Sequence, residues 1–166
     1  MSGKIGIFIF RGRLLLVLII FCYLMACSED AIEEDSFLPP VSGYSLLEVE
    51  LLGLVNNYRK DHGMAELGRL QEISQQAQLH SLHMAGAKEI CHHNFGSRLN
   101  ALKEQVGATA MGENVAQGYR TSEAFFKAWL NSPHHKKIME EENTHFGISA
   151  IQAEDKTYVT LIFIRK

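Results

Sequence analysis

The spacing of apolar residues changes along the chain, from helical in the middle to strand-like at the end. Helical spacing runs through segments at about 45–62, 70–88 and 94–107, where apolar residues recur three or four positions apart. The last third alternates instead: Phe146, Ile148 and Ala150 precede a short polar turn and a second apolar run. Two such runs joined by a short connection predict an antiparallel hairpin. We therefore expect an α+β domain, with a small antiparallel sheet flanked by helices.

Local signals place the ends of the predicted helices. Ser45 and Glu48 have the spacing of a capping box, and the pair His62-Gly63 supplies a stop. One stripe of the second helix consists of Ile73, Ala77, His80 and Met84. On such an apolar stripe, His80 is expected to be a hydrogen-bonded core histidine and not a ligand.

A Gly-Glu-Asn sequence at 112–114 opens the stretch that most suggests chemistry. We expect a strand or an extended loop at 111–118, in which the Gly-Glu-Asn sequence forms a turn that presents Glu113. Asn114 is expected to tie that turn by hydrogen bonds. A helix that carries Trp129, the only tryptophan, follows after a cap at Thr121 or Ser122.

A second, short helix is predicted from Ser132 and Pro133, which suit the N-cap and the first helical position. His135 would lie in the first turn of this helix. Glu113 and His135 are too far apart in sequence to meet through local structure. Only the fold can bring them together, and their meeting place is where a site is expected.

The first 26 residues are expected to be a bacterial lipoprotein signal peptide. A basic leader precedes an apolar run at 14–25, about half of the ~20 residues that a membrane-spanning helix needs. The run ends at Leu24-Met25-Ala26-Cys27, which resembles the lipoprotein box, whose cysteine receives lipid and becomes the mature N-terminus. An uncleaved signal anchor is the alternative. With lipid on Cys27, the protein would be held on a membrane.

Residues 27–43 are expected to be an acidic tether, and residues 44–166 a single domain. The tether has five acidic residues, no basic one, and the stiffening pair Pro39-Pro40. Without the leader, 13 basic residues stand against 19 acidic ones, so the net charge is −6 with neutral histidines. This balance gives no support for a nucleic-acid partner. Once Cys22 is removed and Cys27 is lipidated, Cys91 has no partner for an internal disulfide.

The order of motifs in the domain resembles the CAP superfamily, the cysteine-rich secretory, antigen 5 and pathogenesis-related proteins, in its short bacterial form. The resemblance spans about residues 46–163. It depends on Asn56-Asn57-Tyr58-Arg59, Ala77-Gln78-Leu79-His80-Ser81, Cys91-His92-His93-Asn94-Phe95 with Arg98, Gly112-Glu113-Asn114-Val115-Ala116, Trp129-Leu130-Asn131-Ser132-Pro133-His134-His135 and Phe146-Gly147-Ile148. It implies an α-β-α sandwich (SCP-like), in agreement with the class expected from periodicity.

The resemblance also implies a cleft that can bind a divalent metal. By position, its histidines are His92 and His135 and its acid is Glu113. The second acid of animal-type members falls at Ser132, so the family tetrad is a triad here. An assignment shifted by one position, to His93 or His134, is the alternative.

Two neutral imidazoles and a carboxylate can hold zinc and leave a coordination position open. The same residues can also form a hydrogen-bonded groove without metal, because a buried glutamate needs partners. His83 and His145 are expected at the surface. Cys91 is expected to pack and not to act as a nucleophile with His92, because adjacent side chains in an extended segment point to opposite sides.

Three functions stay open at this point. The favoured one is a lipid-anchored envelope module that binds a lipid, a sterol-like molecule or an envelope component in the cleft, since some CAP relatives bind such ligands. The second is a metal-dependent hydrolase of peptide or cell-wall material, with Glu113 as base and the two histidines as metal ligands. The third is a structural or stress-related envelope protein without an active cleft. No catalytic residue is assigned, and the fold does not name the ligand.

Overall fold

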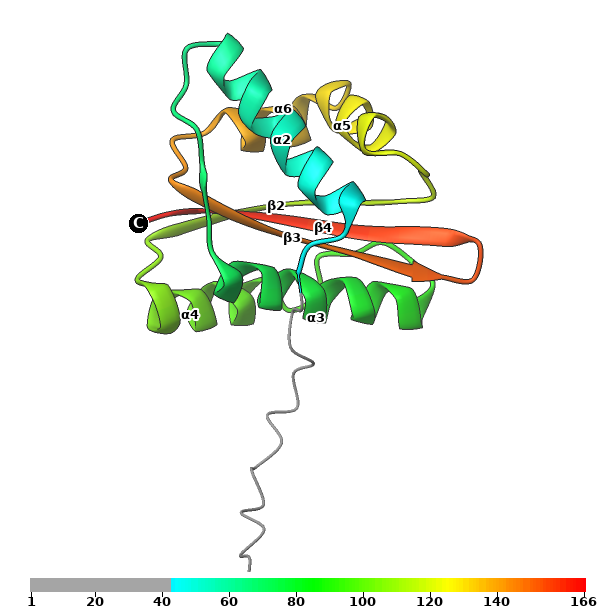
Figure 1. The fold of residues 1–166 in the computed structure, drawn as a ribbon. Coiled ribbons are helices and arrows are strands. Elements are labelled where there is room, and N and C mark those ends of the chain that lie inside the picture. The colour runs from blue at the N-terminus through cyan, green and yellow to red at the C-terminus, as the bar shows by residue number, and fades with distance from the viewer. Residues whose placement is uncertain (1–42) are drawn as a thin grey trace, which may run out of the picture. The chain divides into compact units, whose positions relative to one another are not determined.

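A computed structural model describes residues 43–166, which form a sheet between two layers of helices (Figure 1). On one face lie α3 (Gln71–Ala87) and α4 (Phe95–Val106); on the other lie α2 (Leu46–Asp61), α5 (Ser122–Leu130) and α6 (Pro133–Glu140). The predicted α-β-α sandwich is therefore confirmed. The predicted signal peptide, Cys27 and nearly all of the tether lie outside the described residues. No helix within 43–166 is long and apolar enough to cross a membrane.

The sheet has four strands in the order β1-β3-β4-β2. They are β1 (Gly68–Arg69), β2 (Ala110–Gln117), β3 (His145–Ala153) and β4 (Lys156–Arg165). The expected hairpin is present, because β3 and β4 pair antiparallel, and β4 also pairs antiparallel with β2. The sheet is not wholly antiparallel as predicted: β1 runs parallel to β3. A strand of two residues is too short to show any periodicity in the sequence.

The helix ends follow the local signals. Ser45 and Glu48 form both bonds of the capping box at the start of α2, and the Thr121 side chain caps α5. Pro133 opens α6 as expected, although Ser132 caps it without a side-chain hydrogen bond. The lengths and directions of these helices are thus set largely by nearby residues.

The strand or extended loop expected at 111–118 is strand β2, but one local prediction is wrong: Gly112, Glu113 and Asn114 do not form a turn and lie within this strand. They pair with residues 163, 162 and 161 of β4. Gly112 is needed for close packing, because a Cβ atom there would lie 2.7 Å from the Cγ2 atom of Ile138 in α6. The glycine that suggested a turn therefore lets a helix approach the strand.

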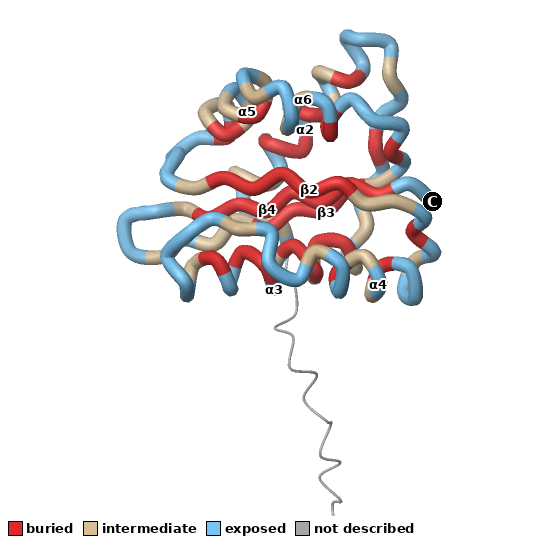
Figure 2. Tube along the Cα trace, turned by 180° about the vertical axis from the view of Figure 1, so that it is seen from behind, coloured by how far each residue is buried: buried red, intermediate tan, exposed pale blue. Residues whose placement is uncertain are grey.

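The main core fills the space between the sheet and the α2, α5 and α6 layer. Leu51, Phe125, Trp129 and Ile148 all belong to this one buried cluster, as expected. A smaller cluster, which includes Ile73 and Leu102 of the opposite helices, packs against the other face of the sheet. Figure 2 shows the long strands buried along most of their length. Because β2 is buried on both faces, its position is well fixed, and so is the position of Glu113 within it.

Candidate functional site

Glu113 is a buried carboxylate held by a buried arginine. The Nε atom of Arg98 donates to Oε2 of Glu113 at 2.8 Å, and Nη2 donates to Oε1 at 2.8 Å. The Glu113 side chain is 0% exposed and that of Arg98 is 7% exposed. This two-pronged contact satisfies both oxygens and balances a charge that would be costly to bury alone. Glu113 is therefore fixed as an ionised hydrogen-bond acceptor.

His92 is the second partner of this carboxylate. Its Nδ1 atom lies 2.7 Å from Oε1 of Glu113, and its side chain is 48% exposed. An ionised carboxylate can only accept, so Nδ1 of His92 must carry the proton. In the neutral ring, Nε2 then keeps its lone pair and is available to a ligand.

His80 is a buried neighbour of the same carboxylate. Its Nε2 atom bonds to the carbonyl oxygen of Cys91 at 2.7 Å and lies 3.7 Å from Oε1 of Glu113. Burial lowers the pKa of His80, and the nearby Glu113 offsets part of that effect. The prediction of a hydrogen-bonded core histidine is confirmed. Its closeness to Glu113 is an unpredicted feature.

His135 approaches from α6, on the other side of the sheet edge. Burial lowers the pKa of His135, and the charges of His134 and His92 lower it further. Both effects favour the neutral form of its ring. The Nδ2 atom of Asn114 donates to the carbonyl oxygen of His135 at 3.1 Å. Asn114 therefore joins strand β2 to helix α6 and does not tie a turn.

The fold brings the three predicted residues to one region, but not as three equal partners. Glu113 contacts His92 directly, whereas His135 contacts β2 through its own backbone. The neighbours in the one-position alternative, His93 and His134, are exposed. His93 stacks on His83, with ring centroids 5.2 Å apart, and the carbonyl oxygen of His93 accepts from Arg98.

Cys91 packs with Met84, Val115 and Tyr158 and is only partly buried. The carbonyl oxygen of Cys91 accepts a hydrogen bond from His80, whereas the side chain of the next residue, His92, forms a hydrogen bond with Glu113. The two neighbours therefore have separate roles. This agrees with the expected packing function of Cys91.

The residues do not fit a three-ligand zinc site as they are arranged. Both oxygens of Glu113 are engaged by Arg98, and a metal bound there would face the guanidinium charge. Among residues 43–166, no group of three or more His, Cys, Asp or Glu side chains is arranged to hold a metal. The imidazoles of His92 and His135 are the remaining groups of the three that could contact a ligand. Zinc binding stays a prediction for experiment.

Arg98 belongs to one of the family motifs, but its role could not be predicted from the motif. The signal was present, since a glutamate expected to be buried requires a cation or several donors nearby. A cavity of about 240 Å³ adjoins the group and is lined in part by His80, His83, His93 and Arg98. A larger cavity, about 410 Å³, lies at the opposite edge of the sheet and contains none of the three predicted residues.

A family model described as the cysteine-rich secretory protein family, CAP, matches residues 52–164. Among curated proteins, the uncharacterized membrane protein YlbC of Bacillus subtilis is 32% identical over 123 residues, 72% of this chain and 34% of that protein. The uncharacterized protein YkwD of the same organism is 29% identical over 116 residues, 68% of this chain and 45% of that protein. The chain thus spans less than half the length of these relatives.

Solved structures give the same fold. An extracellular protein with an SCP domain from Bacillus anthracis matches with a TM-score of 0.62 at 30% identity, over 72% of this chain and 40% of that one. An outer surface protein from Borrelia burgdorferi matches with a TM-score of 0.64 at 19% identity, over 71% of this chain and 91% of that one. At that identity, the second likeness supports the fold alone.

Proposed function

The chain belongs to the CAP family of cysteine-rich secretory proteins, and from that premise we propose that it acts on the outside of the cell as a ligand-binding domain. Solved relatives are described as an extracellular protein and as an outer surface protein. A curated relative is described as a membrane protein. The apolar leader that ends at Cys27 supports attachment by lipid to the cell envelope. The binding site in this proposal is the cleft of His92, Glu113 and His135.

The observation that carries the proposal is the fixed orientation of His92. Glu113 takes the proton side of the His92 ring, and Arg98 holds Glu113 in place. The free Nε2 atom is then an acceptor for a hydroxyl group. The ligand class in this proposal is a lipid or sterol-like molecule, or another envelope component, that presents a hydroxyl to His92 and lies beside the neutral ring of His135.

Binding of cholesterol and of a monoacylglycerol by the mature chain tests this proposal. Each probe carries a hydroxyl, and the methyl ether of cholesterol is a matched molecule without the donor. We expect His92→Ala and His135→Ala to weaken binding about tenfold or more, equivalent to ~1.4 kcal/mol. His93→Ala and His134→Ala are the matched controls, because they remove the exposed neighbours.

Three outcomes would reject the proposed ligand class. One is wild-type affinity in both cleft variants, and another is equal binding of cholesterol and its methyl ether. The third is a lack of saturable binding by either lipid. Loss of affinity in the two control variants instead would move the site by one residue, to the assignment at His93 and His134.

The second candidate is a hydrolase of peptide or cell-wall material with His92 as base. One observation favours it: a carboxylate that orients a histidine through Nδ1 prepares Nε2 to accept a proton. Glu113 itself is not free to act as the base, because Arg98 occupies both of its oxygens. Hydrolysis of peptidoglycan fragments or peptides, lost in His92→Ala and kept in His93→Ala, would establish this candidate over the first.

A further inference from the structure

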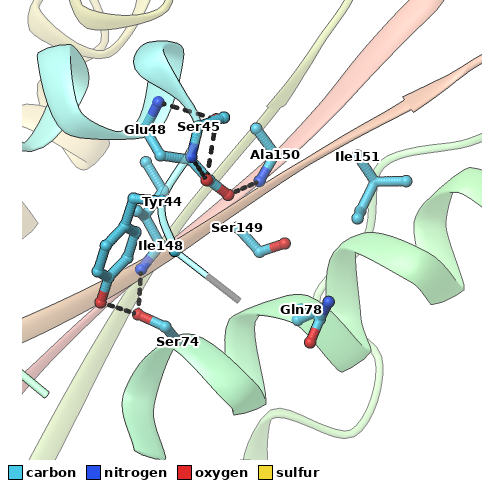
Figure 3. Close-up of a pocket in the computed structure, with 10 residues that line it drawn as sticks. Tyr44, Ser45, Glu48, Ser74, Gln78, Ile148, Ser149, Ala150 and Ile151 are labelled. Atoms are coloured by element: carbon cyan, nitrogen blue, oxygen red, sulfur yellow. Dashed lines mark hydrogen bonds between the residues drawn. The ribbon is translucent and has the colours of Figure 1, made fainter. Parts of the chain in front are cut away.

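The cavity of about 410 Å³ lies against the free edge of β3 (Figure 3), and no residue of the proposed cleft lines it. Its walls are the start of α2 with Tyr44 and Glu48, the first half of α3 with Ser74 and Gln78, and strand residues 148–151. Strand β1 pairs only with the first two residues of β3. Beyond Phe146, no described strand covers this edge, so its backbone groups face the cavity.

Side chains already occupy the N–H groups of this edge. The N–H of Ile148 donates to Oγ of Ser74 at 3.1 Å, and the N–H of Ala150 donates to Oε1 of Glu48 at 2.7 Å (Figure 3). An added peptide strand would need those N–H groups, so the edge is closed to strand pairing. In a strand, the C=O of a residue points to the same side as its N–H. The carbonyls of Ile148 and Ala150 therefore face the cavity as acceptors.

The cavity also carries a negative charge. The carboxylate of Glu48 accepts from the backbone N–H and the hydroxyl of Ser45 and from Ala150, all neutral donors. Within residues 43–166, no lysine, arginine or histidine forms an ion pair with Glu48; Arg69 instead packs on the ring of Tyr44, 5.4 Å from its centroid.

We infer that this cavity is a second binding site, which takes a small polyhydroxylated amine of the size of an amino sugar. An ammonium group would pair with Glu48, and hydroxyls would donate to the carbonyls of Ile148 and Ala150 and to the amide of Gln78. A cavity of this volume falls at the small end of the range for small-molecule sites. The site is separate from the proposed cleft and would exist whether or not that cleft binds lipid.

Nuclear magnetic resonance titration of the isotopically labelled mature chain with D-glucosamine tests the inference. Glucose and N-acetylglucosamine serve as matched sugars without the cationic group. We expect glucosamine to shift the amide signals of residues 148–151 and to bind about tenfold or more tightly than glucose. Glu48→Gln should reduce the affinity for glucosamine to that for glucose. Glu66→Gln, at an exposed site outside the cavity, should have no effect.

Two further measurements keep the test decisive. In Glu48→Gln the single amide oxygen can keep the capping box with Ser45, but the NH2 group cannot accept from the N–H of Ala150, so we expect a lower thermal midpoint, and a cooperative unfolding transition would show that the variant is folded. Gln78→Leu should weaken binding of glucosamine while keeping its preference over glucose. Equal affinity for the charged and neutral sugars, shifts confined to His92, Glu113 and His135, or no saturable shift at all would each overturn the inference.

Discussion

Arg98 holds both carboxylate oxygens of Glu113 from helix α4, which lies on the face of the sheet opposite the helix that carries His135. The two hydrogen bonds are each 2.8 Å long and are buried. The pair changes the chemical role that the motif suggests for Glu113. With its charge balanced, this glutamate orients His92 and is not an open ligand. The partly exposed ring of His92 therefore lies in front of a carboxylate that is itself buried.

Removal of Arg98 should be strongly destabilising. In Arg98→Met, Glu113 keeps a buried charge without its cation, so we expect a loss of ~3–5 kcal/mol in the free energy of unfolding. Urea denaturation measures this loss, and Arg120→Met at an exposed position is the control. A double variant with Glu113→Gln should recover part of the loss. Equal stability of Arg98→Met and wild type would show that the pair contributes nothing.

The orientation of His92 can be read from its tautomer. Because Glu113 accepts from Nδ1, nitrogen chemical shifts at neutral pH should show the proton on Nδ1 of His92. In Glu113→Ala, the Nε2–H form that free histidine prefers should become the major one. The exposed His93 is the internal control and should be unaffected. A wild-type ring protonated on Nε2 would contradict the geometry.

Stability should fall when the pH drops below the ordinary histidine pKa. Burial is the main reason that the pKa values of His80 and His135 lie below 6.5. The unfolded chain therefore binds protons first, and acid favours unfolding. The contribution is complete above pH 6.5 and is lost as the pH falls through 6.5 toward the lowered values. In His80→Gln, the denaturation midpoint should change less between about pH 7 and about pH 5 than in wild type. If it changes as much as in wild type, His80 does not contribute to the pH dependence.

Trp129 anchors the main core, and its truncation should be costly. The side chain is 1% exposed, and its Nε1 atom donates to the carbonyl oxygen of Val115 at 3.2 Å. Trp129→Ala should lower the free energy of unfolding by ~3–5 kcal/mol. Leu46→Ala, at a side chain that is 74% exposed, should change it by no more than ~0.5 kcal/mol. A thermal midpoint of Trp129→Ala equal to wild type would refute this account of the core.

Export and lipidation are testable on the native protein. Mass spectrometry of the membrane fraction should find Cys27 as the mature N-terminus, with lipid attached. Cys27→Ser should retain the leader and abolish the lipid. An unmodified Cys27, or an intact Met1 in the membrane fraction, would reject the lipoprotein assignment and favour a signal anchor.

The sequence by itself determined the features that depend on neighbouring residues. Helix periodicity, the capping box of Ser45 and Glu48, and the alternation of the final hairpin all act over a few residues. Together they predicted the helices, the longer strands and the α+β class. The family motifs added the residues of the proposed site, including His92 beside Glu113. Local signals failed at 112–114, where a Gly-Glu-Asn sequence typical of a turn lies inside a buried strand.

Only the tertiary structure decided what Glu113 does. Arg98 and His92 lie 15 and 21 residues before Glu113, and their contacts with it require α4 and the preceding loop to pack against β2. The same packing places the side chains of the neighbours Cys91 and His92 in different surroundings. It also brings the backbone of His135 to the side chain of Asn114. No local pattern encodes such contacts, because they depend on strand register and on how closely each helix approaches the sheet. The physical reason is burial: a carboxylate enclosed by the fold takes whichever cation the fold places within hydrogen-bonding distance.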